Sequence, residues 1–365
     1  MHFGLSEEQA ELARAVRSLV ERRANLLDMR AAAGSEVGYD TELWEILCGQ
    51  IGAAALAIPE EYGGAGFSSF ETHVVLEELG ATLTPAPLLG SAVLATRAVL
   101  LAGNREDCRR LLPSLANGTS VAALAWADES GRWRSDGSDV RATRDGDRWT
   151  LSGSARLVLD AAAADVLFAV ASTDEGPRLF EVDLSRGVER TATPALDFTL
   201  RLDRVVFEGA AAAPVGGVLS DELATLHAEA AVAVAALQAG GAQGALDRTV
   251  AHLKERVQFG RPLGSFQALK HRVADMLVAV ETARSISWSA AWAAAERAPD
   301  LVHQAAIAKA WCSDAFSTVA SEMVQLHGGI AITWEHDAHL YFKRAHATAQ
   351  LFGSARTHRR SLLDA

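Results

Sequence analysis

Residues 325–356 read QLHGGIAITWEHDAHLYFKRAHATAQLFGSAR, and this stretch says more about the fold than any other. It begins with Gln325 and a glycine pair, Gly328 and Gly329, at the end of an apolar helical run. Paired glycines let a helix end with a positive φ angle and let another backbone or a phosphate come close. The same pair can also be only a helix C-cap, so this stretch alone leaves both interpretations open.

A second stretch, RVQFGRPLGSFQ at residues 256–267, favours the first interpretation. Together the two stretches resemble the C-terminal domain of the acyl-CoA dehydrogenase family. Its flavin signature is an arginine, then Phe-Gly and a glutamine further on, with a later glutamine followed by His-Gly-Gly. A third motif, IPEEYGGAG at residues 58–66, extends the resemblance to the N-terminal half. We therefore expect the resemblance to cover the whole chain.

The composition indicates a soluble globular protein of two or three domains. The chain has 365 residues and a net charge of −12, so we expect no nucleic-acid partner. The N-terminus lacks an apolar signal core and the Ala-rich run at 228–242 is short, so we expect neither a secretory leader nor a membrane span. Three widely spaced cysteines, without metal-ligand spacing, predict reduced packing residues, no metal site and a cytoplasmic protein: Cys48, Cys108 and Cys312.

The hydrophobic periodicity changes twice along the chain and predicts an α+β multidomain protein. Residues 1–118 read as an N-terminal all-α domain, in which Ser6 and Gln9 form a capping box. Residues 119–216 read as short strands separated by turn signals, which predicts a middle antiparallel β-barrel or sandwich. Residues 217–365 read as long Ala-rich amphipathic helices, which predicts a C-terminal four-helix bundle.

Individual elements follow from the same patterns. In the first domain we expect helices at about 39–51, 70–79 and 91–101, the second of these ending at Gly80, and a short helix at 104–112 that ends at Pro113. In the middle domain we expect six strands, at 121–126, 140–143, 149–151, 166–171, 179–182 and 202–207, with a hairpin turn at 144–147. The bundle helices are predicted at 220–258, 265–297, 300–326 and 334–363.

The resemblance implies FAD as the cofactor and assigns residues to it. The family's pyrophosphate-binding arginine corresponds to Arg256, whose guanidinium suits a bidentate grip on phosphate oxygens. The other residues that correspond to nucleotide contacts are Phe259 and Gln267, then Gln325, Gly328 and Gly329 from the neighbouring chain, and Ser354, where the family has a threonine. The alternative is that Arg256 is a surface helix residue and the glycines are caps.

The two family motifs that line the flavin ring are replaced by other residues in this chain. The family has a Thr-Glu-Pro-Gly-x-Gly-Ser-Asp loop where this chain reads AWADESG at residues 125–131. It has Trp-Ile-Thr-Asn where this chain reads LVLD at residues 157–160. Ala331 also replaces the last glycine of the Gly-Gly-x-Gly pattern. The hydrogen bonds that such residues give to flavin N5 and O2 are therefore in doubt.

The base that the reaction needs is missing at the expected position. The family's mechanism removes a proton from Cα of an acyl-CoA thioester while hydride leaves Cβ, so a carboxylate must reach the Cα proton. Counted from Gly329, the catalytic glutamate falls on Phe352. Some members carry the base on the first bundle helix, at a position that is Val234 here. Glu229 lies about 140° around that helix from Val234 and would point elsewhere. No catalytic residue is therefore assigned.

Three functions are compatible with these patterns. The chain is a self-sufficient dehydrogenase with a relocated base, or a cofactor-free scaffold, or a partner subunit that completes the FAD site of a catalytic paralogue. The family includes α₂β₂ assemblies, notably in bacterial sterol side-chain catabolism, and residues 332–344 resemble their shorter subunits. We favour the partner subunit, with acyl-CoA as substrate and an electron-transfer flavoprotein as acceptor. The sequence does not identify the acyl group.

Overall fold

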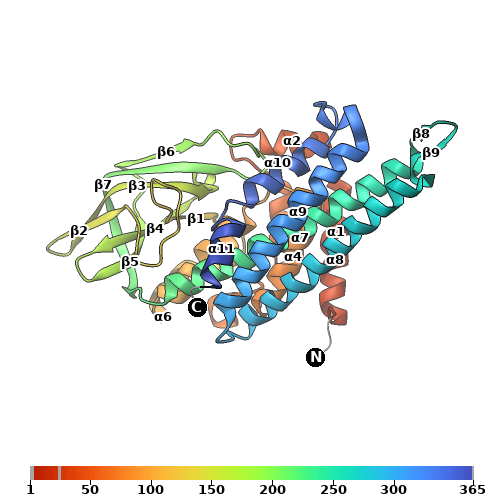
Figure 1. Ribbon diagram of the computed structural model, residues 1–365. Helices are drawn as coiled ribbons and strands as arrows, with labels where there is room; N and C mark the ends of the chain where they lie inside the picture. The colour runs from red at the N-terminus through yellow and green to blue at the C-terminus, as the bar shows by residue number, and fades with distance from the viewer. Residues whose placement is uncertain (1–3, 24–25, 364–365) are drawn as a thin grey trace. The chain divides into compact units, whose positions relative to one another are not determined.

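The computed structural model describes residues 4–23 and 26–363, which divide into two compact units. The first, the bundle unit, comprises Met1–Asp28, His73–Thr84 and Ala231–Ala365. The second, the sheet unit, comprises Met29–Thr72 and Pro85–Ala230. Helices precede and follow a block of strands, which confirms the predicted order of helical, β and helical segments (Figure 1). The boundaries near 118 and 216 remain predictions, because the compact units combine segments from both sides of them.

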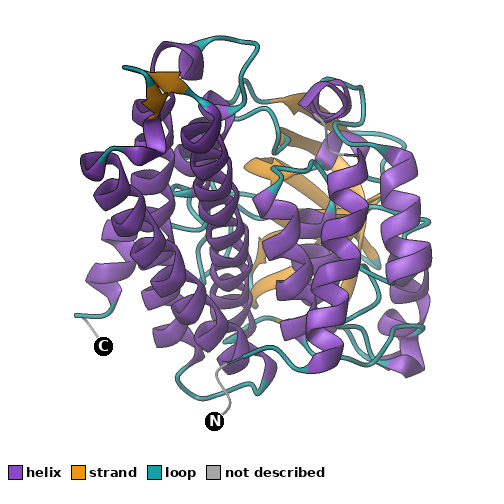
Figure 2. Cartoon of the chain, turned by 90° about the vertical axis from the view of Figure 1, so that its right-hand side faces the viewer, coloured by secondary structure: helices purple, strands orange, loops and turns teal. Residues whose placement is uncertain are grey.

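The bundle unit is built on three long helices that run side by side in Figures 1 and 2: α7 (Glu222–Glu255), which belongs to this unit from Ala231 onward, α8 (Gln267–Ala295) and α9 (Leu301–His327). Helix α1 (Glu7–Arg23) begins with the predicted capping box, since Gln9 N–H donates to Ser6 Oγ (3.2 Å) and Ser6 N–H to Gln9 Oε1 (3.0 Å). Helix α7 is long and apolar enough to cross a membrane, but 83% of its apolar window is buried in the protein, as in a core helix.

The fourth predicted bundle helix is broken. Helix α9 is followed by a 3-10 turn, η6 (Gly328–Ile332), then by α10 (Ala338–Thr348) and α11 (Ala355–Ser361). The single helix expected at 334–363 is therefore wrong. The break falls where Phe352 and Gly353 take positive φ angles of 54° and 100°, and where the Ser354 side chain caps α11.

Two glycines allow the helices of the bundle unit to touch. Helix α4 (Ser69–Ala81) continues through Gly80, so the expected stop at Gly80 is wrong. A Cβ on Gly80 would lie 2.4 Å from the Leu237 carbonyl oxygen, and one on Gly240 would lie 1.8 Å from the Glu77 carbonyl oxygen. Gly80 is thus required for close helix packing and not for a helix end.

In the sheet unit, seven strands form one sheet that closes on itself: β1 (Ala122–Ala125), β2 (Arg141–Asp145), β3 (Arg148–Leu159), β4 (Val166–Thr173), β5 (Gly176–Val182), β6 (Val188–Ala192) and β7 (Leu202–Val218). Their order is β1-β4-β2-β3-β7-β5, with β5 returning to β4 and β6 pairing with β7. The closure agrees with the predicted barrel. The antiparallel prediction fails at β1–β4 and β2–β4, which are parallel. Strand β6 had no sequence signal that we recognised.

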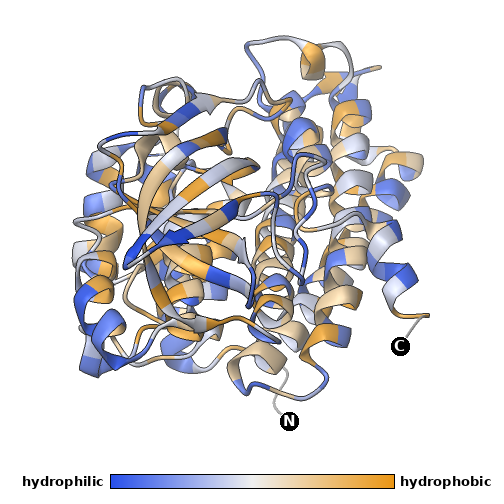
Figure 3. Ribbon diagram, turned by 90° about the vertical axis from the view of Figure 1, so that its left-hand side faces the viewer, coloured by the Kyte–Doolittle hydropathy of each residue, from blue (hydrophilic) through white to orange (hydrophobic). Residues whose placement is uncertain are grey.

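The barrel encloses an apolar core. Fully buried side chains from several strands meet inside it, among them Leu151, Leu167, Phe180 and Val205. Figure 3 shows hydrophobic and hydrophilic residues succeeding one another along the strands. The predicted hairpin at 144–147 joins β2 and β3, with Asp145 opposite Arg148 and Gly146 at a φ angle of 61°.

The remaining helices of the sheet unit differ slightly from the prediction. They are α2 (Leu26–Ala33), α3 (Thr41–Ile46), α5 (Thr96–Ala102) and α6 (Arg105–Ala116), with the π-helical segments η1 (Leu47–Ile51) and η3 (Leu88–Ala95) and the 3-10 turns η2 (Glu60–Tyr62) and η4 (Ala161–Ala163). Helix α6 does not end at Pro113. Its last turn persists because Leu112 and Leu115 are buried.

Candidate cofactor site

Arg256 lies immediately after α7, at the base of a small hairpin formed by β8 (Val257–Gln258) and β9 (Arg261–Pro262). The hairpin is closed by a hydrogen bond from Leu263 N–H to the Arg256 carbonyl (2.8 Å). The Arg256 side chain is exposed and forms no ion pair with any described residue. Its guanidinium is therefore free to bind an anion.

Phe259 and Gln267 lie on and beside this hairpin. Phe259 is 89% exposed and takes a φ angle of 54° at the tip. Phe266 holds the base of the hairpin, since the Arg261 guanidinium lies 3.9 Å from its ring centroid. Gln267 is the first residue of α8, and its exposed amide has no hydrogen bond within the described chain.

Gln325, Gly328 and Gly329 lie at the C-terminal end of α9, and all three are exposed. Gly328 ends the helix with φ 69° and ψ −146°, a combination that only glycine adopts readily. A Cβ built on Gly328 or Gly329 would find no atom within 4 Å. The backbone here is open to a ligand.

Contacts between helices bring these two groups of residues to the same end of the bundle unit. His252 of α7 stacks on His327 of α9, with ring centroids 4.2 Å apart, one turn before Arg256 and one residue before Gly328. Arg272 of α8 binds Glu322 of α9 (2.6 Å). Burial lowers the pKa of His327 to about 4, so this histidine is neutral at pH 7. The cofactor residues predicted from two distant motifs thus share one end of the bundle unit, and the assignment of Gln325, Gly328 and Gly329 to a neighbouring chain's FAD remains a prediction.

Ser354 is placed differently. Its hydroxyl accepts a hydrogen bond from Thr357 N–H (3.2 Å) and caps α11, and it lies 3.0 Å from the Thr357 hydroxyl. Within the described residues, no contact joins Ser354 to any of the other predicted cofactor residues at residues 256–267 and 325–329. Its cofactor role remains a prediction.

The base positions hold no free carboxylate. Phe352 is 1% exposed, and Val234 is fully buried. Glu229 is also buried and accepts two hydrogen bonds from the Arg97 guanidinium, at 2.6 and 2.7 Å. The Glu229 carboxylate is occupied by this ion pair, and the assignment of no base to these positions remains a prediction.

In the sheet unit, Glu129 of the loop after β1 is bound by side chains of β3 and β7. Glu129 accepts hydrogen bonds from Ser154, Arg204 (2.6 Å) and Arg156 (2.7 Å). The Ser154 hydroxyl, followed by the two guanidinium groups, lowers the pKa of Glu129 to about 2. We call Glu129, Ser154, Arg156 and Arg204 the Glu129 cluster. The Glu129 carboxylate is thus already bound by three side chains of the protein.

The LVLD segment has a second peculiarity. Leu157 and Asp160 both take positive φ angles, 52° and 56°, around a register shift between β3 and β7. Asp160 is buried, and burial together with the nearby Asp203 carboxylate raises its pKa to about 8. Leu157 and Leu159 offer no side-chain hydrogen bond where the family has Trp and Thr.

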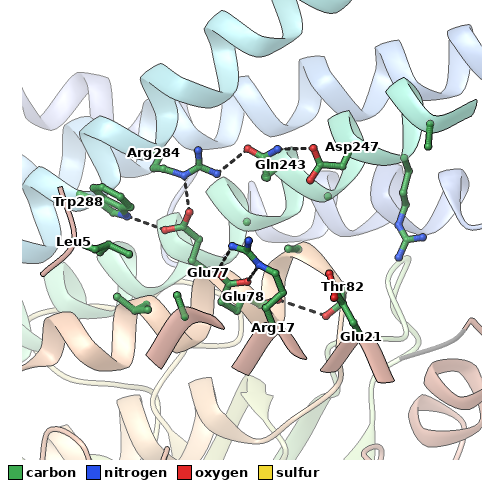
Figure 4. A pocket seen from close by; sticks show the side chains of 17 residues that line it. Leu5, Arg17, Glu21, Glu77, Glu78, Thr82, Gln243, Asp247, Arg284 and Trp288 are labelled. Atoms are coloured by element: carbon green, nitrogen blue, oxygen red, sulfur yellow. Dashed lines mark hydrogen bonds and ion pairs between the residues drawn. The ribbon is translucent and has the colours of Figure 1, made fainter. Parts of the chain in front are cut away.

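A cavity of about 760 Å³ opens within the bundle unit, between α1, α4, α7 and α8. Figure 4 shows that its charged groups bind one another, with Arg284 between Glu77 (2.8 Å) and Gln243 (2.7 Å). Arg17 similarly binds Glu78 through two nitrogens. None of the predicted cofactor residues lines this cavity.

Comparison with known proteins identifies the class to which this fold and site belong. Residues 6–119 match the N-terminal domain of acyl-CoA dehydrogenase, and residues 223–365 match its C-terminal domain. The chain therefore belongs to the acyl-CoA dehydrogenase family, which comprises flavoprotein oxidoreductases of lipid and steroid metabolism. FAD is the cofactor of this family, as the resemblance implied.

Among its relatives is acyl-CoA dehydrogenase IpdE2 of Mycolicibacterium smegmatis, which is 42% identical over 98% of both chains. Two solved structures are similar over nearly their whole length. One is the Tcur3481-Tcur3483 steroid ACAD, with a TM-score of 0.88 and 33% identity over 98% of this chain and 97% of that one. The other is the ChsE4-ChsE5 complex from Mycobacterium tuberculosis, with a TM-score of 0.91 and 30% identity over 100% and 98%.

The residues present fit one half of FAD. Arg256, the free amides of Gln267 and Gln325, and the open backbone at Gly328 and Gly329 suit a pyrophosphate and its nucleotide. The Glu129 cluster and the two leucines of the LVLD segment do not suit the flavin ring.

Proposed function

We propose that this chain is a partner subunit of a heteromeric acyl-CoA dehydrogenase. It completes the FAD site of a catalytic paralogue and does not itself remove the substrate proton. One contrast carries the proposal. The Arg256 guanidinium is exposed and has no ion pair with a described residue, whereas the expected base position is filled by the buried Phe352 ring. The two solved structures reported above support the proposal, because each is named for a pair of proteins, Tcur3481-Tcur3483 and ChsE4-ChsE5.

The proposed chemistry is α,β-dehydrogenation of an acyl-CoA thioester. FAD, when bound, supplies the acceptor for the Cβ hydride. In this chain Arg256 would bind the pyrophosphate, and Gly329 would offer its backbone N–H to an anion at the same end of the bundle unit, whereas the Gly328 N–H already donates to the Val324 carbonyl. The Cα proton must go to a carboxylate of the paralogue, since Phe352 and Val234 cannot accept it and Glu229 is bound to Arg97.

The remaining parts of the proposal rest on the family. The substrate is an acyl-CoA, and the word steroid in one relative's name favours a sterol-derived or other lipid thioester. An electron-transfer flavoprotein is the proposed acceptor, and the cytoplasm is the proposed location.

The experiment is to purify the chain alone and after co-expression with a dehydrogenase paralogue from a neighbouring gene. Acyl-CoA-dependent reduction of an electron acceptor is then measured for both. We expect activity only in the complex, and we expect Glu→Gln at the paralogue's base to abolish it although this chain is intact. General base catalysis supplies about 10²–10⁴-fold in rate, so the loss is easily measured. Turnover by the isolated chain at an ordinary enzymatic rate would show instead a self-sufficient enzyme with a relocated base.

A further inference from the structure

Lys309 is a fully buried lysine in the middle of α9, within the bundle unit. Its ammonium donates three hydrogen bonds, to the Ala349 carbonyl (3.2 Å), the Gly353 carbonyl (3.1 Å) and the Ser313 hydroxyl (3.0 Å). All three of its N–H donors are therefore used. Lys309 is the one lysine of α9, and a lone lysine in an Ala-rich helix is a visible signal in the sequence.

The two carbonyls belong to the Phe352 turn, residues 349–354, which joins α10 to α11. The turn is strained, because Phe352 is not glycine and has a φ angle of 54°. A second buried side chain also binds it, since His358 Nε2 lies 2.8 Å from the Phe352 carbonyl oxygen. Two helices thus each direct a nitrogen at backbone oxygens of this one turn.

A buried network of polar side chains surrounds the Lys309 ammonium. The Gln238 amide donates to Ser313 Oγ (3.0 Å) and Thr348 Oγ1 (3.3 Å), and all three side chains are buried. This network connects α7, α9 and α10 around the ammonium, so Lys309 has a defined position.

Stability alone does not explain a cation at this place. Burial lowers the pKa of Lys309 to about 7, which means that the surroundings disfavour its charge. A methionine of similar length would fill the same space without that penalty. What a methionine cannot do is donate hydrogen bonds to the two carbonyls.

We infer that Lys309 is a positioning residue, whose ammonium fixes the Phe352 turn and with it the Phe352 ring and the Ser354 hydroxyl. Its bonds go to backbone oxygens, so the turn is held whatever side chain stands at position 352. The family's base position can therefore carry a phenylalanine while the backbone of the turn keeps its conformation. The functional part of the inference, the placing of Ser354 toward the cofactor, rests on the proposed function.

The test is hydrogen–deuterium exchange of the full chain, wild type against Lys309→Met, with the exposed Lys270→Met as the matched control. In Lys309→Met, peptides covering residues 349–361 should exchange about tenfold to a hundredfold faster, because bonds from a charged donor are lost. Peptides of α7 in the bundle unit should be unchanged. Lys309→Gln, which can still donate to one carbonyl, should lie between. Phe352→Leu should leave the exchange of the turn within about threefold of wild type, because every bond from Lys309 and His358 goes to the backbone.

Three outcomes would overturn the inference. One is unchanged exchange at 349–361 in Lys309→Met. Another is an equal acceleration throughout the bundle unit, or failure of both Lys309 variants to fold, which would make the lysine a general core residue. The third is loosening of the turn by Phe352→Leu as large as that by Lys309→Met. The measurement needs neither flavin nor a second subunit, so its failure is separate from failure of the proposed function.

Discussion

The two halves of the expected cofactor site differ in what their polar groups bind. In the bundle unit, Arg256, Gln267 and Gln325 are exposed and bind no described side chain. In the sheet unit, Glu129 is bound by Ser154, Arg156 and Arg204. An exposed side chain without a protein partner is available to a ligand, whereas a side chain that is hydrogen-bonded within the chain must first give up that bond. The comparison separates residues that are available to a ligand from residues that are already bound within the chain, and it motivates the proposal that only the nucleotide-binding residues of this chain serve FAD.

The largest expected effect tests the base position. Phe352→Glu should lower the free energy of unfolding by at least about 3 kcal/mol, because a buried ring is lost and a carboxylate is buried in its place. Dehydrogenase activity of the isolated chain should not appear, since the ring-side residues at 125–131 and 157–160 are still missing. Chemical denaturation and an acyl-CoA assay measure the two quantities.

Phe352→Leu is the matched control for that variant and should cost less than about 1.5 kcal/mol. If Phe352→Glu alone gives an active enzyme without a second chain, the sheet-unit half of the site is not closed.

A smaller effect tests the open half. Arg256→Ala should weaken FAD retention in the complex about tenfold to a hundredfold, because a charge-assisted contact worth roughly 1.5–3 kcal/mol is lost. The measurement is the dissociation constant for FAD, followed by flavin fluorescence. Lys254→Ala, an exposed lysine two residues earlier, is the control and should leave the constant unchanged. Equal FAD affinity in Arg256→Ala and the control would remove Arg256 from the site.

The smallest effect concerns the Glu129 cluster. The pKa of Glu129 is lower in the folded state than in the unfolded state. The cluster therefore stabilises the protein at pH values above the unfolded pKa of Glu129, about 4.5. That stabilisation is lost as the pH falls toward 2. Because Glu129 is 40% exposed, we expect Glu129→Gln to cost less than about 1 kcal/mol at pH 7 and to flatten the pH dependence in this window.

FAD content should be the same in Glu129→Gln and wild type. A fall in flavin content would show that Glu129 serves the cofactor, and the contrast between the two halves would not hold.

The sequence predicted most of what depends on local chemistry. The Ser6–Gln9 capping box, the hairpin at 144–147 and the three long helices follow from hydrogen-bonding residues, turn residues and periodicity close together in the chain. The motif residues Arg256 and Gly328 were also identified from sequence, and the structure shows that they share one end of the bundle unit.

What the sequence did not predict depends on contacts between distant segments. Gly80 resembles a helix end, and only its approach to Leu237 shows that it allows two helices to touch. The parallel pairing of β1 with β4 depends on the path of the barrel and not on either strand. The break at 349–354 depends on Lys309, which is forty residues away in sequence from the first carbonyl that it binds.

The most direct test of the account is the number of FAD molecules per chain. If this subunit supplies only the nucleotide-binding half, the isolated chain should purify without flavin absorbance. A complex of equal numbers of the two chains should then hold one FAD for every two chains, and Arg256→Ala should lower that value. One FAD on every chain of the complex, or a full complement on this chain alone, would contradict the account.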